Sequence, residues 1–177
     1  IEETYMQHAY LNEAENISET EKRQLRSVSE TMGDVTAQDS LKNLAGILYR
    51  YYGKKAIILL DEYDTPMQEA YIHGYWDEFT AFIRSLFNSS FKTNPYMERG
   101  IMTGITRVSK ESIFSDLNNL NVVTTTSEEY ATCFGFTETE VFDALAEYQL
   151  TDQKEMVKNW YDGFTFGTHK DIYNPWS

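Results

Sequence analysis

The stretch Ala56-Ile57-Ile58-Leu59-Leu60, followed directly by Asp61-Glu62, decides the fold class. Five consecutive apolar residues without polar alternation are typical of a parallel strand that is buried on both faces. Helix-forming patterns follow this run, and residues Arg99 to Arg107 then read as a second central strand whose two glycines permit close backbone approach. Strand, helix and strand in this order predict a βαβ unit, and therefore an α/β fold with a parallel sheet.

The rest of the chain divides around this unit. A third strand is predicted at Val122 to Thr126, because these residues are rich in β-branched side chains. Farther on, Thr137-x-x-Glu140 predicts a capping box that opens a helix. The expected parts are an N-terminal helical segment (1–36), an α/β core bearing both central strands (37–132) and a helical subdomain with a small β-hairpin (133–177).

The composition excludes several classes of protein. The 177 residues contain 15 Lys and Arg against 28 Asp and Glu, a formal net charge of −13, which disfavours direct nucleic-acid binding because phosphates require clustered cations. No apolar run approaches the roughly 20 residues that a membrane-spanning helix needs. The single cysteine, Cys133, rules out an intramolecular disulfide. We therefore expect a cytoplasmic globular protein without a membrane segment.

The acidic pair after the first strand is the strongest chemical signal. An apolar strand followed by Asp61-Glu62 has the pattern of a Walker B segment, in which a carboxylate at the strand end holds the waters of a Mg²⁺ ion. The second carboxylate, Glu62, would then polarise an attacking water. An alternative stays open, namely that Asp61 and Glu62 are ordinary solvated residues at the end of a strand.

Two residues near the end of the second strand extend this hypothesis. Thr106 and Arg107 would emerge at the same sheet edge as Asp61 if the strands are adjacent and parallel. A hydroxyl or a guanidinium group at this edge can detect or stabilise a phosphate. The alternative for Arg107 is a salt bridge with one of the many carboxylates.

The sequence also lacks a motif that phosphate binding would need. No G-x-x-x-x-G-K-[ST] occurs, and the one Gly-Lys pair, Gly53-Lys54, is followed by Lys55. Catalysis by this chain alone is therefore not expected. Because the sequence begins at Ile1 rather than at a methionine, we expect it to be a fragment of a longer protein.

Several stretches occur together in one order: Ile57 to Pro66, Thr103 to Leu120, Phe134 to Thr137, Trp160 to Phe164 and Tyr173 to Ser177. In this combination the chain after about Leu41 resembles the bacterial AAA-ATPase-like family of predicted ATP-binding proteins. The resemblance is more specific than any one of the motifs.

The resemblance implies a partial P-loop NTPase, with an AAA-like parallel sheet flanked by helices. It also implies an upstream strand and phosphate-binding loop, and often a downstream domain similar to PD-(D/E)XK nucleases. Asp61 and Glu62 match the Walker B acidic pair, whereas Thr106 and Arg107 match the region after the sensor strand. Mg²⁺ and ATP are the cofactors implied for the complete parent protein. The missing loop argues against their binding to this chain alone.

A second hypothesis is a scaffold that does not hydrolyse nucleotide and recognises a protein partner. Its contact surface would be the acidic N-terminal helices or an aromatic C-terminal surface, although aromatic residues at such spacings favour a buried core. Homo-oligomerisation is a further possibility, since Arg107 acting between subunits would make assembly part of catalysis. The aromatic candidates are Trp160, Tyr161, Phe164, Phe166 and Trp176.

Overall fold

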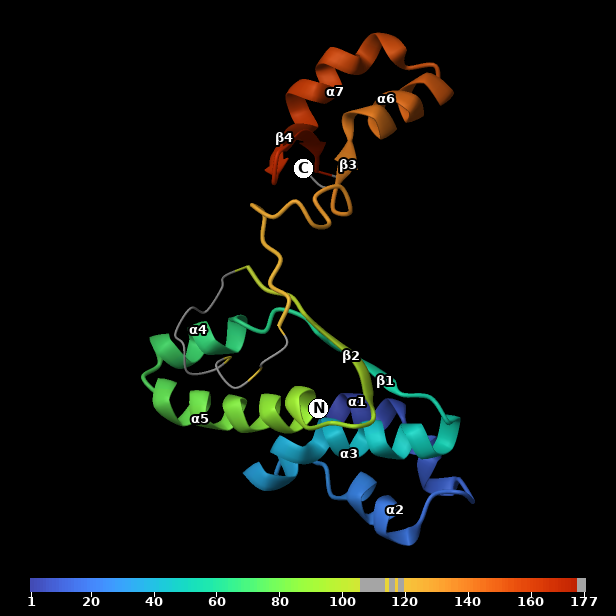
Figure 1. Ribbon diagram of the computed structural model, residues 1–177, viewed down its shortest axis with the longest axis vertical. Helices are drawn as coiled ribbons and strands as arrows, with labels where there is room; N and C mark the ends of the chain where they lie inside the picture. The colour runs from blue at the N-terminus through green and yellow to red at the C-terminus, as the bar shows by residue number, and fades with distance from the viewer. Residues whose placement is uncertain (106–113, 115–116, 118–119, 175–177) are drawn as a thin grey trace. The chain divides into compact units, whose positions relative to one another are not determined.

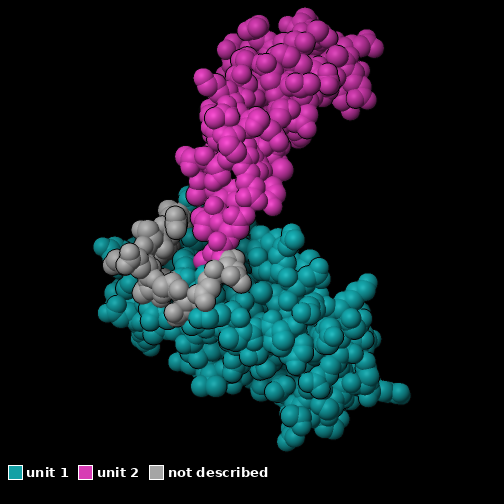
Figure 2. Space-filling view, in the orientation of Figure 1, with its two compact units in different colours: residues 1–119 teal, residues 120–177 magenta. Residues whose placement is uncertain are grey.

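A computed structural model describes residues 1–105, 114, 117 and 120–174. The chain forms two compact units, residues 1–119 and 120–177, here called the first unit and the second unit (Figures 1 and 2). The domain boundaries expected at 36 and 132 stay predictions. None of the described helices is long and apolar enough to cross a membrane. The cytoplasmic location also stays a prediction.

The N-terminal part of the first unit is a small helical layer. Helices α1 (Glu2–Gln7) and α2 (Glu19–Arg26) flank a 3₁₀ turn, η1 (Ala9–Glu13), and the long helix α3 (Asp34–Tyr52) follows. Helix α3 ends at Gly53, whose φ of 68° is the left-handed conformation that terminates helices. These elements enclose a first hydrophobic core, formed by Tyr5, Leu11, Ile17, Leu25, Leu44 and Ile47.

The predicted βαβ unit is present. Strand β1 (Ala56–Leu60) pairs in parallel with β2 (Met97–Met102), with Leu59 opposite Ile101. The chain between the two strands forms α4 (Thr65–Ile72), α5 (Trp76–Phe87) and a π-helical turn, η2 (Asn88–Lys92). Gly100 permits the close approach that the sequence suggested, because a Cβ there would lie 2.6 Å from the Phe91 ring.

A second core lies on one face of this two-stranded sheet. Leu60 and Met102 pack against a buried cluster from α4 and α5 that contains Met67, Ile83, Leu86 and Phe87. The prediction that β1 is buried on both faces is wrong, because Ile57 and Leu59 are 58% and 72% exposed. Alternate residues of a strand point to opposite faces, and the described helices of this unit pack on one of them.

The second unit combines two helices with a small antiparallel sheet. Strand β3 (Phe136–Thr137) leads into α6 (Glu138–Glu147), and a 3₁₀ turn, η3 (Thr151–Gln153), leads into α7 (Lys154–Tyr161). The hairpin that the sequence predicted is formed by β4 (Asp162–Phe166) and β5 (His169–Tyr173). The strand order is β3-β5-β4, and the capping box of Thr137 and Glu140 is present at the start of α6.

The third strand predicted at Val122 to Thr126 is absent from these described residues. The segment instead forms a turn in which the backbone N–H of Thr124 donates to the Ser127 hydroxyl at 3.0 Å. The N–H of Ser127 donates back to the Thr124 carbonyl at 2.9 Å. Short hydroxyl side chains can form hydrogen bonds with backbone groups that would otherwise pair in a sheet. Here these local bonds outweigh the β propensity of the β-branched residues.

The described aromatic candidates of the second unit are exposed or half-buried, so the interpretation that favoured a buried core is wrong for them. Trp160 is 72% exposed, Phe164 is 47% exposed and Tyr161 is 42% exposed. Phe166 is half-buried and stacks on Phe164 with ring centroids 6.0 Å apart. Their helix and hairpin are too small to enclose them. Trp176 lies outside the described residues.

Candidate functional site

The candidate site lies where β1 and β2 end, and Figure 1 shows the two strands side by side. The backbone pairing continues past both strands. Thr103 donates its N–H to the Leu60 carbonyl at 2.9 Å, and Tyr63 donates its N–H to the Thr103 carbonyl at 3.0 Å. Asp61 and Glu62 stand between these two bonds. The acidic pair is therefore tied to the end of the second strand, at the carboxyl edge of a parallel sheet.

The carboxylate of Asp61 is oriented by two hydrogen bonds to one of its oxygens. Oδ1 accepts the backbone N–H of Glu62 at 3.0 Å and also the hydroxyl of Thr103 in a short hydrogen bond. The other oxygen, Oδ2, accepts no hydrogen bond from the described residues. Asp61 is exposed, so Oδ2 is accessible to a water molecule or to a hydrated cation.

Glu62 has an unusual backbone conformation for a residue with a side chain. Its φ is 51°, in the left-handed region, which costs an ordinary L-residue about 1–2 kcal/mol. The conformation belongs to a tight turn, in which the Glu62 carbonyl accepts the N–H of Thr65 at 3.1 Å. Backbone strain of this kind concentrates at functional sites. The exposed Glu62 directly follows Asp61 in this turn.

The buried Asp64 and the exposed Gly104 both lie close to this turn. Asp64 is 1% exposed and stands at the N-terminus of α4, where its carbonyl accepts the N–H of Gln68 at 3.0 Å. Its Oδ2 also accepts the Gln68 side-chain amide at 3.3 Å. A Cβ at Gly104 would lie 2.5 Å from Asp64 Oδ1 and 2.8 Å from the Tyr63 ring. Only a glycine allows the end of β2 to approach so closely.

Two predicted site residues, Thr106 and Arg107, lie outside the described residues, so the structure does not test their proximity to Asp61. The hydroxyl group that contacts Asp61 belongs to Thr103, which sequence reasoning missed. Thr103 lay inside the predicted strand Arg99 to Arg107, so it carried no signal of its own, and only the strand register places it opposite Asp61. Asp64 was also missed, although Asp before Thr-Pro is a common helix start.

Few groups at this edge can ligate a metal directly. Among the residues that the structure describes, no three His, Cys, Asp or Glu side chains gather closely enough to hold a metal ion. Asp61 offers one free carboxylate oxygen and Glu62 another exposed carboxylate nearby. Such a donor set fits Mg²⁺, which retains several of its waters and uses one or two protein carboxylates.

Comparison with known families shows to which family the chain belongs. The sequence profile described as "Predicted AAA-ATPase" matches residues 2–114. The chain belongs to this family. The match includes β1, β2 and every candidate residue of the sheet edge, from Asp61 and Glu62 to Arg107. It confirms the resemblance that the sequence motifs indicated.

One curated relative of the chain is a protein of Azotobacter chroococcum mcd 1, described as "Uncharacterized protein in vnfD 5'region". It is 30% identical over 125 residues, which is 70% of this chain and 24% of the relative. The chain thus spans about a quarter of the length of that protein. No solved structure matches the chain.

Proposed function

We propose that the protein binds and hydrolyses ATP with Mg²⁺, and that the edge formed by the ends of β1 and β2 supplies the acidic half of the site. The observation that carries this proposal is the orientation of Asp61. One carboxylate oxygen is held by Thr103 and by the Glu62 N–H, and the other is open at the carboxyl edge of a parallel pair. The family membership supports a nucleotide as the ligand.

Each side chain of the proposed site has a different role in phosphoryl transfer. Asp61 would hold the cation through its waters, with Oδ2 as the acceptor, and the cation would supply positive charge for the phosphates. Glu62 orients the attacking water and accepts its proton. Thr103 is a positioning residue, because it fixes the Asp61 carboxylate and touches no reacting atom. Thr106 and Arg107, which lie outside the described residues, would contact the phosphate, and the complete parent protein would supply the phosphate-binding loop.

The test is Glu62→Gln in the full-length protein. The amide retains the size of the side chain but cannot accept a proton, so Mg-ATP binding is expected to persist while kcat falls about 10²–10⁴-fold. Glu98→Gln is the matched control, because Glu98 is an exposed carboxylate near the opposite end of β2. Its kcat is expected to equal that of the wild type. Unchanged turnover in Glu62→Gln contradicts the proposed role.

A second candidate function is favoured by the exposure of Trp160, Tyr148 and Phe134, at 72%, 74% and 69%. Large exposed aromatics are common at protein–protein contact sites. We propose as the alternative a scaffold that binds a protein partner through the second unit and does not hydrolyse ATP. The same experiment separates the two functions. A full-length wild type that neither binds nor hydrolyses Mg-ATP favours the scaffold.

A further inference from the structure

One face of the β1–β2 sheet is apolar and exposed. In the strand register Ile57 lies opposite Arg99, and Leu59 lies opposite Ile101, so these four side chains share a face. Ile57, Leu59 and Ile101 are 58%, 72% and 45% exposed. Helices α4 and α5 pack on the other face through the second core. The face that carries Ile57, Leu59, Ile101 and Arg99 is here called the open face.

The open face continues to the acidic pair. Asp61 comes two positions after Leu59, and Thr103 comes two positions after Ile101, so both continue the alternation of their strands. The hydrogen bond between the Thr103 hydroxyl and the Asp61 carboxylate places these two side chains on one side. The open face therefore has an acidic group at the carboxyl end of the strands.

Cations gather at the opposite end of the same strands. Arg99 is exposed near the start of β2, and Lys54 and Lys55 are exposed just before β1. None of these three cations forms an ion pair with a described residue. In a chain with a net charge of −13, the amino end of this sheet is thus locally basic.

The composition of β1 suits a strand that is covered on both faces. A strand with one face in water normally alternates apolar and polar residues, whereas Ala56 to Leu60 are all apolar. Parallel sheets occur almost only where helices cover both faces. The described residues supply that cover on one face and leave Leu59 on the other in water.

We propose that an amphipathic helix of the complete parent protein covers the open face, with apolar side chains on Ile57, Leu59 and Ile101 and acidic side chains over Arg99. The unpaired cations at that end favour an acidic segment there and disfavour a basic one. The same polypeptide is the source, because a parallel strand of this composition needs permanent cover. The match to the curated relative spans 24% of that protein, whose remaining length has room for such a helix.

The test is photo-cross-linking in the full-length protein, with Leu59→p-benzoylphenylalanine and, separately, Ile57→p-benzoylphenylalanine. After irradiation, mass spectrometry is expected to find each position joined to a segment of the same molecule outside residues 1–177. Two strand positions span about 7 Å, so the two sites in that segment should lie about four helical residues apart. The site reached from Ile57 should be the one nearer to Asp or Glu, because Arg99 lies opposite Ile57.

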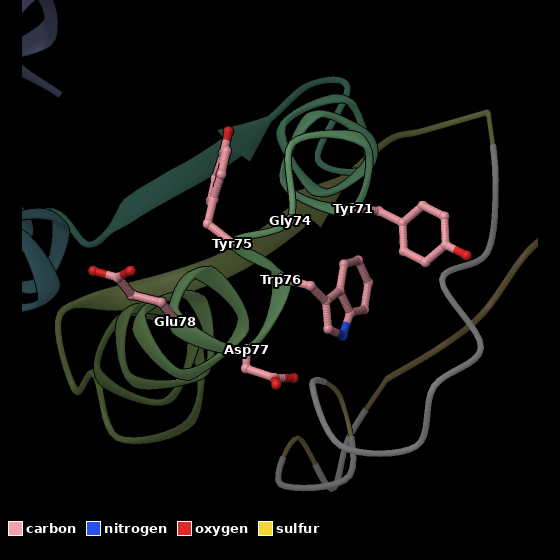
Figure 3. A pocket seen from close by; sticks show the side chains of 6 residues that line it. All are labelled: Tyr71, Gly74, Tyr75, Trp76, Asp77 and Glu78. Atoms are coloured by element: carbon pink, nitrogen blue, oxygen red, sulfur yellow. The ribbon is translucent and has the colours of Figure 1, made fainter.

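The matched control is Tyr71→p-benzoylphenylalanine. Tyr71 is 71% exposed, close to the value for Leu59, but it stands on α4 and lines the hollow at the turn between α4 and α5 (Figure 3). It is expected not to react with the segment that Leu59 reaches. The proposal is overturned by cross-links to a second copy or to another protein, by cross-links only within residues 1–177, or by none. It is also overturned if Tyr71 reaches the same segment equally well.

A second measurement needs no substitution. Hydroxyl-radical oxidation of the full-length protein, normalised to the intrinsic reactivity of each residue type, reports how far a side chain is exposed to water. Oxidation of Leu59 is expected to be about five-fold or more below that of Tyr71, because the helix removes most of the Leu59 surface from water. Equal values would overturn the proposal. Neither measurement depends on ATP hydrolysis, so the proposed function can fail without affecting this one.

Discussion

The two units of the chain are stabilised in different ways. The first unit encloses two clusters of buried apolar residues, one under α3 and one between the sheet and α5. In the described part of the second unit, the buried hydrophobic residues are Ala131, Ile172 and Tyr173, and neither α6 nor α7 contains a buried residue. The first unit is therefore stabilised mainly by burial, and the second depends more on hydrogen bonds, helix caps and ion pairs.

The polar contacts of the second unit converge on Lys158 of α7. Its Nζ lies 2.5 Å from Glu138 at the start of α6, 3.3 Å from Asp171 on β5 and 3.8 Å from Asp162 on β4. The hydrogen bond to Glu138 is the largest cause of a raised pKa of the Lys158 ammonium group, and Asp171 adds to it. One cation thus links both helices to the hairpin, where an apolar core would otherwise do so.

The largest effect is expected from removing a buried ring in the first unit. Phe87 is 2% exposed and packs on Phe91 and Phe114, so Phe87→Ala should lower the free energy of unfolding by about 3–5 kcal/mol. Trp160→Ala in the second unit removes a larger ring, but this ring is 72% exposed. The free energy of unfolding should therefore change by about 0.5 kcal/mol or less. Urea unfolding, with hydrogen exchange to resolve the units, measures both. Similar losses in the two variants would contradict the comparison.

A smaller, salt-dependent effect is expected from Lys158→Met. The variant keeps the length of the side chain and removes the charge, which leaves Glu138, Asp162 and Asp171 without their common cation. Hydrogen-exchange protection of residues 120–174 should fall, while that of the first unit should not change. Added salt should reduce the protection in the wild type and have little effect in the variant, since screening weakens partly exposed ion pairs. Equal salt responses would contradict this role of Lys158.

The sequence predicted those features of the fold that depend on neighbouring residues. The apolar run of β1 and the capping box at Thr137 were both found, because strand formation and helix capping are visible within a few positions. The covered face of β1 was not predictable, since an apolar run does not show which neighbours pack on it. The absent strand at Val122 to Thr126 has a similar cause, because hydroxyl bonds to the backbone outweighed β propensity.

In the candidate site, too, the features that depend on neighbouring residues were predictable and those that depend on distant ones were not. Asp61 and Glu62 were recognisable because the acidic pair directly follows a strand. The contribution of Thr103 depends on the register of β2 against β1. Thr103 and Asp61 are 42 positions apart in the sequence, and no local pattern encodes that register. The left-handed conformation of Glu62 was also not predictable from the sequence, because glutamate, unlike glycine, does not favour a positive φ.

A local effect is expected at the capping box that starts α6. The Thr137 hydroxyl accepts the N–H of Glu140, and the Glu140 carboxylate accepts the N–H and the hydroxyl of Thr137 at 2.8 and 2.7 Å. Thr137→Ala should cost the second unit about 1 kcal/mol.

The backbone N–H of Thr137, followed by its hydroxyl, lowers the pKa of the Glu140 carboxyl. A pKa that is lower in the folded state means that the stabilisation is present above the pKa of the unfolded chain, and is lost as the pH falls through the folded value. The stability of the second unit should therefore decline on acidification below about pH 4.3, the ordinary value for Glu. Glu140→Gln should lack this component of the decline when hydrogen exchange is compared at pH 6 and pH 3. An unaltered acid response in Glu140→Gln would show that other carboxylates, such as those around Lys158, account for it, and that the cap contributes little to the second unit.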